Sequence, residues 1–131
     1  MIWQRGSLTA EQAHLVFKYL PLEVSFADEN DILVFWCGTE SYKTCDARYI
    51  GRDVRDCHPQ QSLAVLEAIL REFKAGTKDV AEGWSTLPDG SVKLTRYLAV
   101  RDGGTYKGTL ETIVRLAQFQ RYRGEQALPG W

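Results

Sequence analysis

The sequence predicts an α+β domain: a five-stranded antiparallel sheet with helices packed on one face. Two short apolar strands come first, one strongly amphipathic helix follows, and three further strands separated by turn signals complete the pattern. Strands that precede and follow one long helix in the sequence can pair in a single sheet, with the helix packed on one face of that sheet. A length of 131 residues suits one domain with one modest core.

The chain begins with a short amphipathic helix, predicted over residues 7–20. Thr9 and Gln12 have the spacing of a capping box, and Pro21 ends the helix. We expect this helix to lie outside the sheet core. The predicted organisation is therefore an N-terminal helix, a core and a C-terminal tail, at residues 1–20, 21–120 and 121–131.

Two strands are predicted next, at residues 22–27 and 31–37. Acidic residues and Asn at positions 28–30 fit a hairpin turn between them. The second strand is apolar on both faces, so it is either central and covered on both sides or exposed at an oligomer contact. Residues 38–56 then form a polar, irregular connection, a kind of segment in which ligand sites are often found.

The clearest element is a helix predicted over residues 59–75. Pro59 suits its first position, and Gly76 supplies the left-handed residue that commonly ends a helix. We expect a cavity between this helix and the sheet, walled by the helix, by the final two strands, and by Leu33 and Phe35. Apolar residues at helical spacing form the stripe that faces this cavity: Leu66, Ile69, Leu70 and Phe73.

Cys57 and His58 directly precede this helix. The positive end of the helix dipole stabilises a thiolate and disfavours an imidazolium, which holds both side chains in the forms that bind metal ions. The structural alternative is that His58 caps the helix while Cys57 fills an apolar gap, as buried cysteines ordinarily do. A zinc site that joins them to Cys37 and Cys45 is disfavoured, because close ligand pairs are lacking.

Three strands separated by Pro-Asp-Gly and Asp-Gly-Gly turns are predicted after the helix, at residues 80–87, 92–101 and 106–118. If the two glycines of the second turn are its loop residues, Arg96 lies opposite Glu111. Opposite charges paired across strands are mildly favourable, of order 0.2–1 kcal/mol. We interpret this pair as a structural salt bridge rather than as a ligand-anchoring arginine.

Composition excludes several classes of function. The net charge is -1 with no basic block, which argues against a nucleic-acid partner. No apolar run approaches the roughly 18 residues that a membrane span requires, and the N-terminus lacks the apolar core of a signal peptide. Three cysteines without C-x-x-C spacing fit a reduced, cytoplasmic protein.

Five segments of the chain match a known pattern: FADEND at 26–31, GRDVRDCHP at 51–59, FKAG at 73–76, KDVAE at 78–82 and RYLAVRD at 96–102. With the order of elements, they resemble a PAS domain. More narrowly, the chain resembles the PAS domain found C-terminal to hemerythrin-like regions in a group of bacterial proteins. The resemblance covers residues 8–125, and its Cys-His-Pro and Lys-Asp-Val-Ala-Glu segments are specific to that group.

The resemblance implies a PAS fold and a signal-sensing module, usually dimeric, whose cavity holds haem, a flavin or a small metabolite. Haem-binding relatives often use a histidine on the long helix, so His58 is the candidate iron ligand here, with Cys57 as neighbour or alternative ligand. The resemblance does not identify the cofactor, and haem is the most testable one. Ile32 and Val34 depart from the family pattern, in which these positions are commonly polar, and an added apolar patch favours a dimer interface.

Two hypotheses of function follow. The first is a non-enzymatic sensor that binds a small ligand or haem in the helix–sheet cavity and signals through dimer or partner contacts. The second is a ligand-free dimerisation or interaction module. In both, the first helix and the sheet face supply the contact: Val16, Phe17, Ile32, Val34 and Trp84. An enzyme with Cys57 as nucleophile and His58 as base is disfavoured, because adjacent residues rarely converge on one substrate atom.

Overall fold

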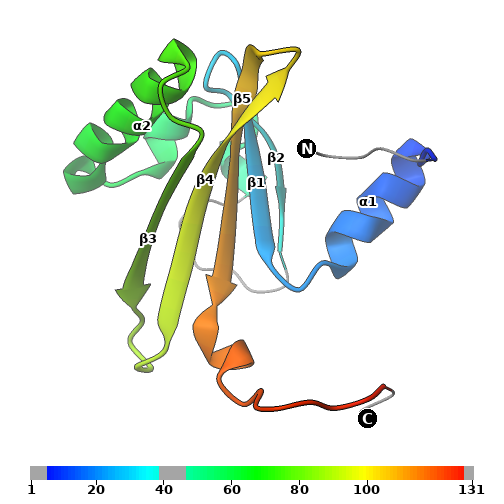
Figure 1. The fold of residues 1–131 in the computed structure, drawn as a ribbon. Coiled ribbons are helices and arrows are strands. Elements are labelled where there is room, and N and C mark those ends of the chain that lie inside the picture. The colour runs from blue at the N-terminus through cyan, green and yellow to red at the C-terminus, as the bar shows by residue number, and fades with distance from the viewer. Residues whose placement is uncertain (1–5, 39–46, 129–131) are drawn as a thin grey trace.

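The structure, a computed structural model, describes residues 6–38 and 47–128. It contains a five-stranded antiparallel sheet in the order β2-β1-β5-β4-β3, with α2 (Leu63–Ala75) lying across one face (Figure 1). The predicted α+β class and five-stranded sheet are confirmed. The strands, in chain order, are β1 Glu23–Asp28, β2 Leu33–Cys37, β3 Val80–Thr86, β4 Val92–Asp102 and β5 Thr105–Arg115.

The first helix, α1 (Ala10–Tyr19), projects away from the sheet beside β1 and β2 (Figure 1). The predicted capping box is present, because the Thr9 hydroxyl accepts from the Gln12 backbone N–H while the Gln12 side chain accepts from the Thr9 backbone. No residue of α1 is buried. Its contact with the sheet includes a ring pair between Phe17 and Phe35, with centroids 5.2 Å apart.

A bulge in the first hairpin decides which side chains of β2 face α2. Phe26 pairs with Phe35, but the next residue of β1, Ala27, pairs with Leu33. Val34 is therefore the extra residue, and a one-residue shift moves the following side chains to the other face. Leu33 is buried beneath α2, whereas Phe35 lies on the outer face, against Phe17.

The main helix begins later than its sequence predicts. Residues Gln60–Ser62 form a 3₁₀ turn, η3, in which the Ser62 backbone N–H and hydroxyl both donate to the Pro59 carbonyl. The α-helical bonds start only at Leu63. Cys57 and His58 are consequently not at the N-terminus of α2, and the helix-dipole argument for their metal-binding forms was wrong.

The rest of α2 follows its pattern. Leu66, Leu70 and Phe73 are buried, as the apolar stripe predicts. Gly76 ends the helix with φ 77°, the left-handed conformation that glycine adopts without strain. The helix covers a core that includes Ala27 of β1.

The register of the last hairpin also differs from the prediction. Arg101 pairs with Tyr106, but the preceding residue of β4 pairs with Gly108, so Lys107 is an extra residue in β5. The shift places Tyr97, not Arg96, opposite Glu111. The predicted Arg96–Glu111 pair was therefore wrong, and Arg96 instead bonds Glu82 of β3, with Nε 3.0 Å from Oε2.

A buried carboxylate, Asp31, ties the turn between β1 and β2 to the segment that carries Cys57 and His58. One of its oxygens lies 3.1 Å from Arg55 Nη1 and 2.6 Å from Lys74 Nζ of α2. Arg55 belongs to a second 3₁₀ turn, η2 (Val54–Cys57), and also binds Glu67 of α2. In addition, the Val54 N–H donates to the Asp31 carbonyl. We call the contacts of Asp31 with Arg55 and Lys74 the Asp31 clasp. This clasp holds η2 against both the β1–β2 hairpin and α2.

Candidate functional site

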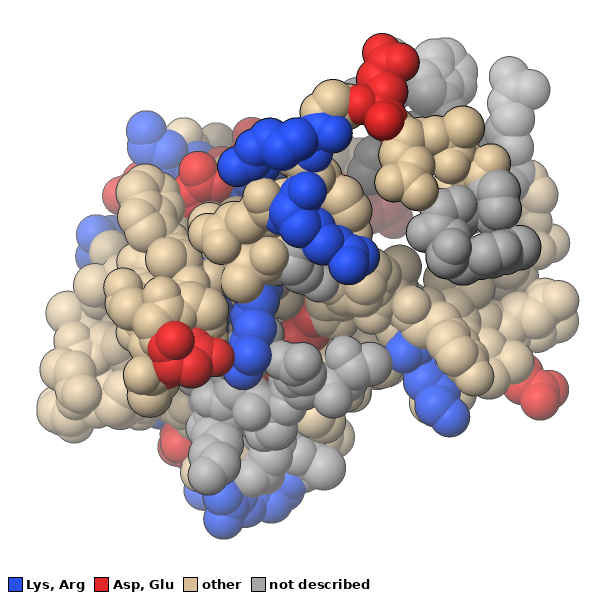
Figure 2. Space-filling view, turned by 90° about the horizontal axis from the view of Figure 1, so that it is seen from below, with Lys and Arg blue, Asp and Glu red and all other residues tan. Residues whose placement is uncertain are grey.

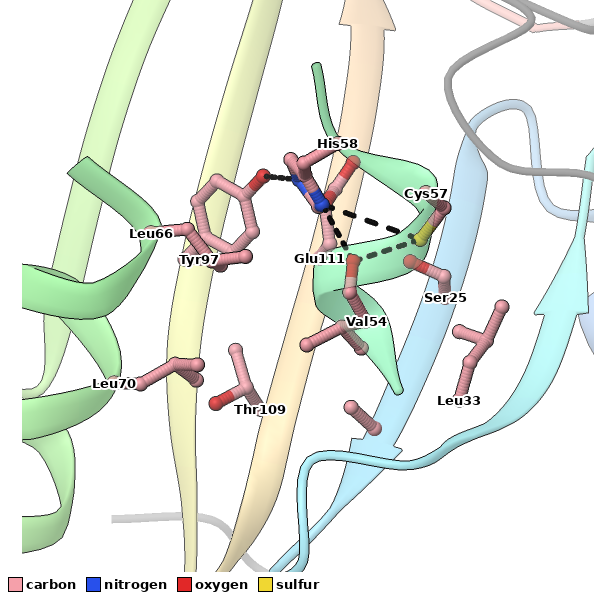
Figure 3. A pocket seen from close by; sticks show the side chains of 11 residues that line it. Ser25, Leu33, Val54, Cys57, His58, Leu66, Leu70, Tyr97, Thr109 and Glu111 are labelled. Atoms are coloured by element: carbon pink, nitrogen blue, oxygen red, sulfur yellow. Dashed lines mark hydrogen bonds between the residues drawn. The ribbon is translucent and has the colours of Figure 1, made fainter. Parts of the chain in front are cut away.

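A small cavity lies between the sheet, α2 and η2, with a volume of about 30 Å³ (Figure 3). A cavity of about 10–15 Å³ on this measure holds one water molecule, so there is space for a ligand of a few non-hydrogen atoms. One wall is apolar and the other carries hydroxyl, carboxyl, imidazole and thiol groups. The lining residues are Ser25, Ala27, Leu33, Val54, Cys57, His58, Leu66, Leu70, Tyr97, Thr109 and Glu111.

The polar wall is built across three neighbouring strands. Glu111 lies on β5, the central strand, with Ser25 opposite it on β1 and Tyr97 opposite it on β4. Opposed residues of antiparallel strands point to the same face, so the three side chains form a row across the sheet. Thr109, two residues before Glu111 on the same strand, extends this wall.

His58 covers this row from the side of η2. Its Nδ1 lies 2.9 Å from the Val54 carbonyl oxygen and its Nε2 lies 3.2 Å from the Tyr97 hydroxyl. A carbonyl only accepts, so Nδ1 carries a proton and, in the neutral ring, Nε2 is the acceptor. Figure 3 shows His58, Tyr97 and Glu111 gathered at one end of the cavity. Both ring nitrogens are thus engaged within the protein.

The pKa values of two side chains in the cavity, Glu111 and His58, are shifted from their usual ranges. Burial raises the pKa of Glu111, and the Tyr97 hydrogen bond and the nearby His58 charge act in the opposite direction. Hydrogen bonding with Cys57 and with the Val54 carbonyl raises the pKa of His58, against the effect of burial, and the charge of Glu111 adds to the increase. A carboxyl and an imidazole with displaced pKa values in one cavity are typical of functional sites.

Four of the five predicted site residues line the cavity: His58, Cys57, Leu66 and Leu33. Phe35 does not, because the Val34 bulge turns it to the outer face. The sequence prediction also missed the polar wall, which is formed by Ser25, Tyr97, Thr109 and Glu111. The signal for the wall is the alternation of polar residues along β5, but the wrong hairpin register assigned Glu111 to a structural salt bridge with Arg96.

Haem, the most testable of the cofactors that the resemblance leaves open, does not fit this arrangement. A porphyrin ring is many times larger than a cavity of about 30 Å³. Iron at Nε2 of His58 would also displace the Tyr97 hydroxyl from its hydrogen bond. The described residues contain no group of three or more His, Cys, Asp or Glu arranged to hold a metal ion, and Cys45 lies outside them.

Cys57 is not arranged as an activated nucleophile. Its Sγ donates to the Val54 carbonyl at 3.1 Å and lies 4.0 Å from Nδ1 of His58. Because Nδ1 gives its own proton to the same carbonyl, it is not free to take the thiol proton.

A family model described as "PAS domain" matches residues 14–116, most of the chain. The chain belongs to the PAS domain family. The predicted PAS fold and the broader part of the resemblance are therefore confirmed. PAS domains are generally sensory and non-catalytic. No curated protein matches the chain.

Several solved structures share this PAS fold. The C-terminal domain of a Streptococcus mutans protein has a TM-score of 0.80 and 27% identity, over 91% of this chain and 93% of that one. A sensor histidine kinase from Vibrio cholerae has a TM-score of 0.54 and 8% identity, over 79% and 86%. VqmA of Vibrio cholerae, in a structure with DPO bound, has a TM-score of 0.54 and 22% identity, over 83% and 58%.

The surface carries charges of both signs. Figure 2 shows blue basic and red acidic side chains on the face seen from below, with broad areas of other residues between them. Within residues 6–38 and 47–128, none of the helices is long and apolar enough to cross a membrane.

Proposed function

We propose that this PAS domain is a non-enzymatic sensor that binds a small molecule in the helix–sheet cavity. The observation that carries the proposal is the polar wall inside an otherwise apolar cavity. A cavity that served packing alone would be apolar, whereas placing a carboxyl, an imidazole and hydroxyl groups there requires partners for them. The fold shared with VqmA, which has been solved with DPO bound, agrees with a small-molecule ligand.

The signal leaves through the outer face of the sheet. Leu94 and Leu98 of β4 point to the face opposite the cavity, because Tyr97 between them faces inward. Their β3 partners on that face, Trp84 and Val80, have 71% and 54% of their surface exposed. The Glu82–Arg96 ion pair lies between these two apolar pairs on the same face. An apolar strip interrupted in this way is suited to contact with a second copy of the chain or with a partner domain.

The first helix lies beside β1 and β2, at the edge of the sheet opposite β3, and supplies a second part of the contact (Figure 1). Val16 has 48% of its surface exposed, and Phe17 packs on the outward-facing Phe35. Val34, the bulged residue, is also exposed, whereas Ile32 is half-buried and pairs with Asp53. We therefore assign the predicted homodimer contact to α1, Val34 and Trp84, and Ile32 at most to its edge.

A thermal-shift screen with a library of small polar fragments tests the sensor function. Ligands that bind only the folded state raise the melting temperature, by an amount that grows with the logarithm of the ligand concentration relative to the dissociation constant. We expect stabilising fragments for the wild-type protein and for Ser85→Leu, a matched change on the exposed part of β3. Ser25→Leu, which fills the cavity, should abolish the shift. Fragments that stabilise all three proteins equally bind elsewhere and would count against the proposal.

A ligand-free interaction module is the second candidate, and the exposed Trp84 favours it. The two functions predict different outcomes for the Ser25→Leu variant and for the fragment screen. A pure interaction module self-associates or binds its partner equally well with Ser25→Leu, and no fragment from the library stabilises it. A sensor loses its ligand response with that variant.

A further inference from the structure

Among the described residues that line the cavity, the acidic group has no basic counterpart of permanent charge. Glu111 provides a carboxylate in the middle of the polar wall, and none of the described lining residues is Lys or Arg. Lys93 acts on Glu111 electrostatically but is not part of the lining. His58 is the only described lining residue that can become cationic near neutral pH. An anionic ligand would meet the carboxylate without a permanent positive charge to offset it.

The hydrogen-bond directions leave Glu111 as an acceptor. Nδ1 of His58 donates to Val54, so the neutral ring must accept at Nε2. Tyr97 has one hydroxyl proton to share between that nitrogen and Glu111. An ionised carboxylate has about four acceptor sites, so the one proton of Tyr97 does not saturate it. Because burial raises the pKa of Glu111, the ionised form is favoured when a bound group supplies N–H donors or a positive charge.

The size of the cavity limits the part of a ligand that reaches Glu111. A volume of about 30 Å³ accommodates a few non-hydrogen atoms. A planar amidinium presents two parallel N–H donors, one from each nitrogen, to the two oxygens of a carboxylate, whereas a primary amide presents one such donor. The apolar wall, formed in part by Leu66 and Leu70, suits a short hydrocarbon portion.

We propose, building on the sensor function above, that the cavity recognises a small ligand with N–H donors and no anionic group, of the amidinium or primary amide type, through the Glu111 carboxylate. Ser25 and Tyr97 flank the carboxylate and position the bound group. The class excludes carboxylates and phosphates.

Three isosteric probes test this assignment: acetamidinium, acetamide and acetate. They share a planar four-atom skeleton and differ in charge and in N–H donors. Binding is followed by NMR through the His58 ring and the methyl groups of Leu66 and Leu70. We expect acetamidinium to bind at least about tenfold more tightly than acetate, with acetamide between them. Glu111→Gln should reduce the difference to about threefold or less.

The control variant is Glu82→Gln, which removes an exposed carboxylate on the opposite face and should leave the order of affinities unchanged. Acetate binding as tightly as acetamidinium, or an order unaffected by Glu111→Gln, would overturn the assignment and point to protonated His58 as the recognition group. The order measured on wild-type protein decides the matter even if Glu111→Gln does not fold. If none of the probes moves the cavity signals, the ligand class is wrong, while the sensor function is judged separately by the fragment screen with Ser25→Leu.

Discussion

Glu111 is the residue on which the chemistry of the cavity depends. It sits on the central strand between Ser25 and Tyr97, enclosed beneath His58. Such a placement has a cost in stability, because ionising a buried carboxyl is unfavourable. Sites that retain such a group at the expense of stability are commonly functional.

The raised pKa of Glu111 makes stability fall as pH rises. The folded state holds the proton more tightly than the unfolded state, so the favourable contribution is present below the unfolded pKa of about 4.3 and is lost as pH rises through the folded pKa. We expect the wild-type protein to lose unfolding free energy relative to Glu111→Gln above about pH 4.3. Urea unfolding at several pH values measures this, with Glu82→Gln as control. A pH-independent difference between wild type and Glu111→Gln would contradict the burial of the carboxyl.

Gly108 is a second residue whose role is fixed by its surroundings. It has φ 147°, and a Cβ there would lie 2.6 Å from the Phe26 ring and would also collide with the Ala27 carbonyl oxygen. We expect Gly108→Ala to destabilise the protein by about 2 kcal/mol or more. Gly83→Ala, on β3 with open space around it, should change stability by less than about 0.5 kcal/mol. Equal melting temperatures for the two variants would show that β1 and β5 are not packed this closely.

At the scale of elements, η2 matters because it carries His58 and Cys57 to the cavity. Its position relies on the Asp31 clasp, in which one buried carboxylate binds both Arg55 and Lys74. Asp31 has φ 65°, a conformation that Asn also tolerates. Asn therefore replaces Asp31 without backbone strain and removes only the charge.

We expect Asp31→Asn to destabilise the fold by about 1–3 kcal/mol, less than for a fully buried pair because Arg55 and Lys74 are partly exposed. It should also broaden or shift the NMR signals of the His58 ring, since η2 loses its anchor. Asp79→Asn, at an exposed carboxylate that pairs with Arg101, serves as control and should cost less than about 1 kcal/mol. An Asp31→Asn protein with wild-type stability would show that the clasp is dispensable.

The elements were predictable from the sequence where local periodicity alone determines them. The face of α2 follows from a 3.6-residue period, and the α1 cap follows from Thr9 and Gln12. The start of α2 was not predictable, because residues 60–62 form a 3₁₀ turn whose residues carry no strong signal against α-helix.

The two bulges limited the prediction of the site. Val34 and Lys107 each add one residue to a strand, and each reverses the faces of the residues beyond it. Val34 has no side chain that signals a bulge. Gly108, directly after Lys107, is such a signal, because an isolated glycine within a strand often marks a bulge. His58 was found because its placement does not depend on the register. Phe35 and Glu111 were misplaced because theirs does.

At the scale of the molecule, the sheet separates two surfaces with different tasks. The cavity lies on the α2 side, and an apolar strip containing Trp84 and Val80 lies on the other side. Tyr97 and its neighbours on β4 alternate between the two, so a shift of this strand on ligand binding would be felt on the outer face. A sensor requires that the ligand bind with different affinity to two conformations of the domain, and these conformations must differ at the contact surface.

We expect the protein to self-associate through this outer face. Trp84→Ser should weaken the association by about 2 kcal/mol, because exposed tryptophans in apolar strips are frequent hot spots of binding energy. Val65→Ser alters an equally apolar and exposed position on α2 and should leave association unchanged. Sedimentation velocity over a range of concentrations measures both variants. A wild-type protein that stays monomeric, or one in which Val65→Ser has the larger effect, would exclude this face.

The most direct test of the account is one NMR titration with two reporters, the His58 ring in the cavity and the Trp84 indole on the outer face. Wild-type protein is titrated with the fragments that stabilise it, in parallel with the Ser25→Leu protein. If the domain is a small-molecule sensor, a fragment shifts the His58 signals, and the Trp84 signal changes in proportion to them along the titration. Both shifts disappear when Ser25→Leu fills the cavity. If no fragment moves the His58 ring, or if Ser25→Leu responds as the wild-type protein does, the cavity is not a ligand site and the domain acts through its surface alone.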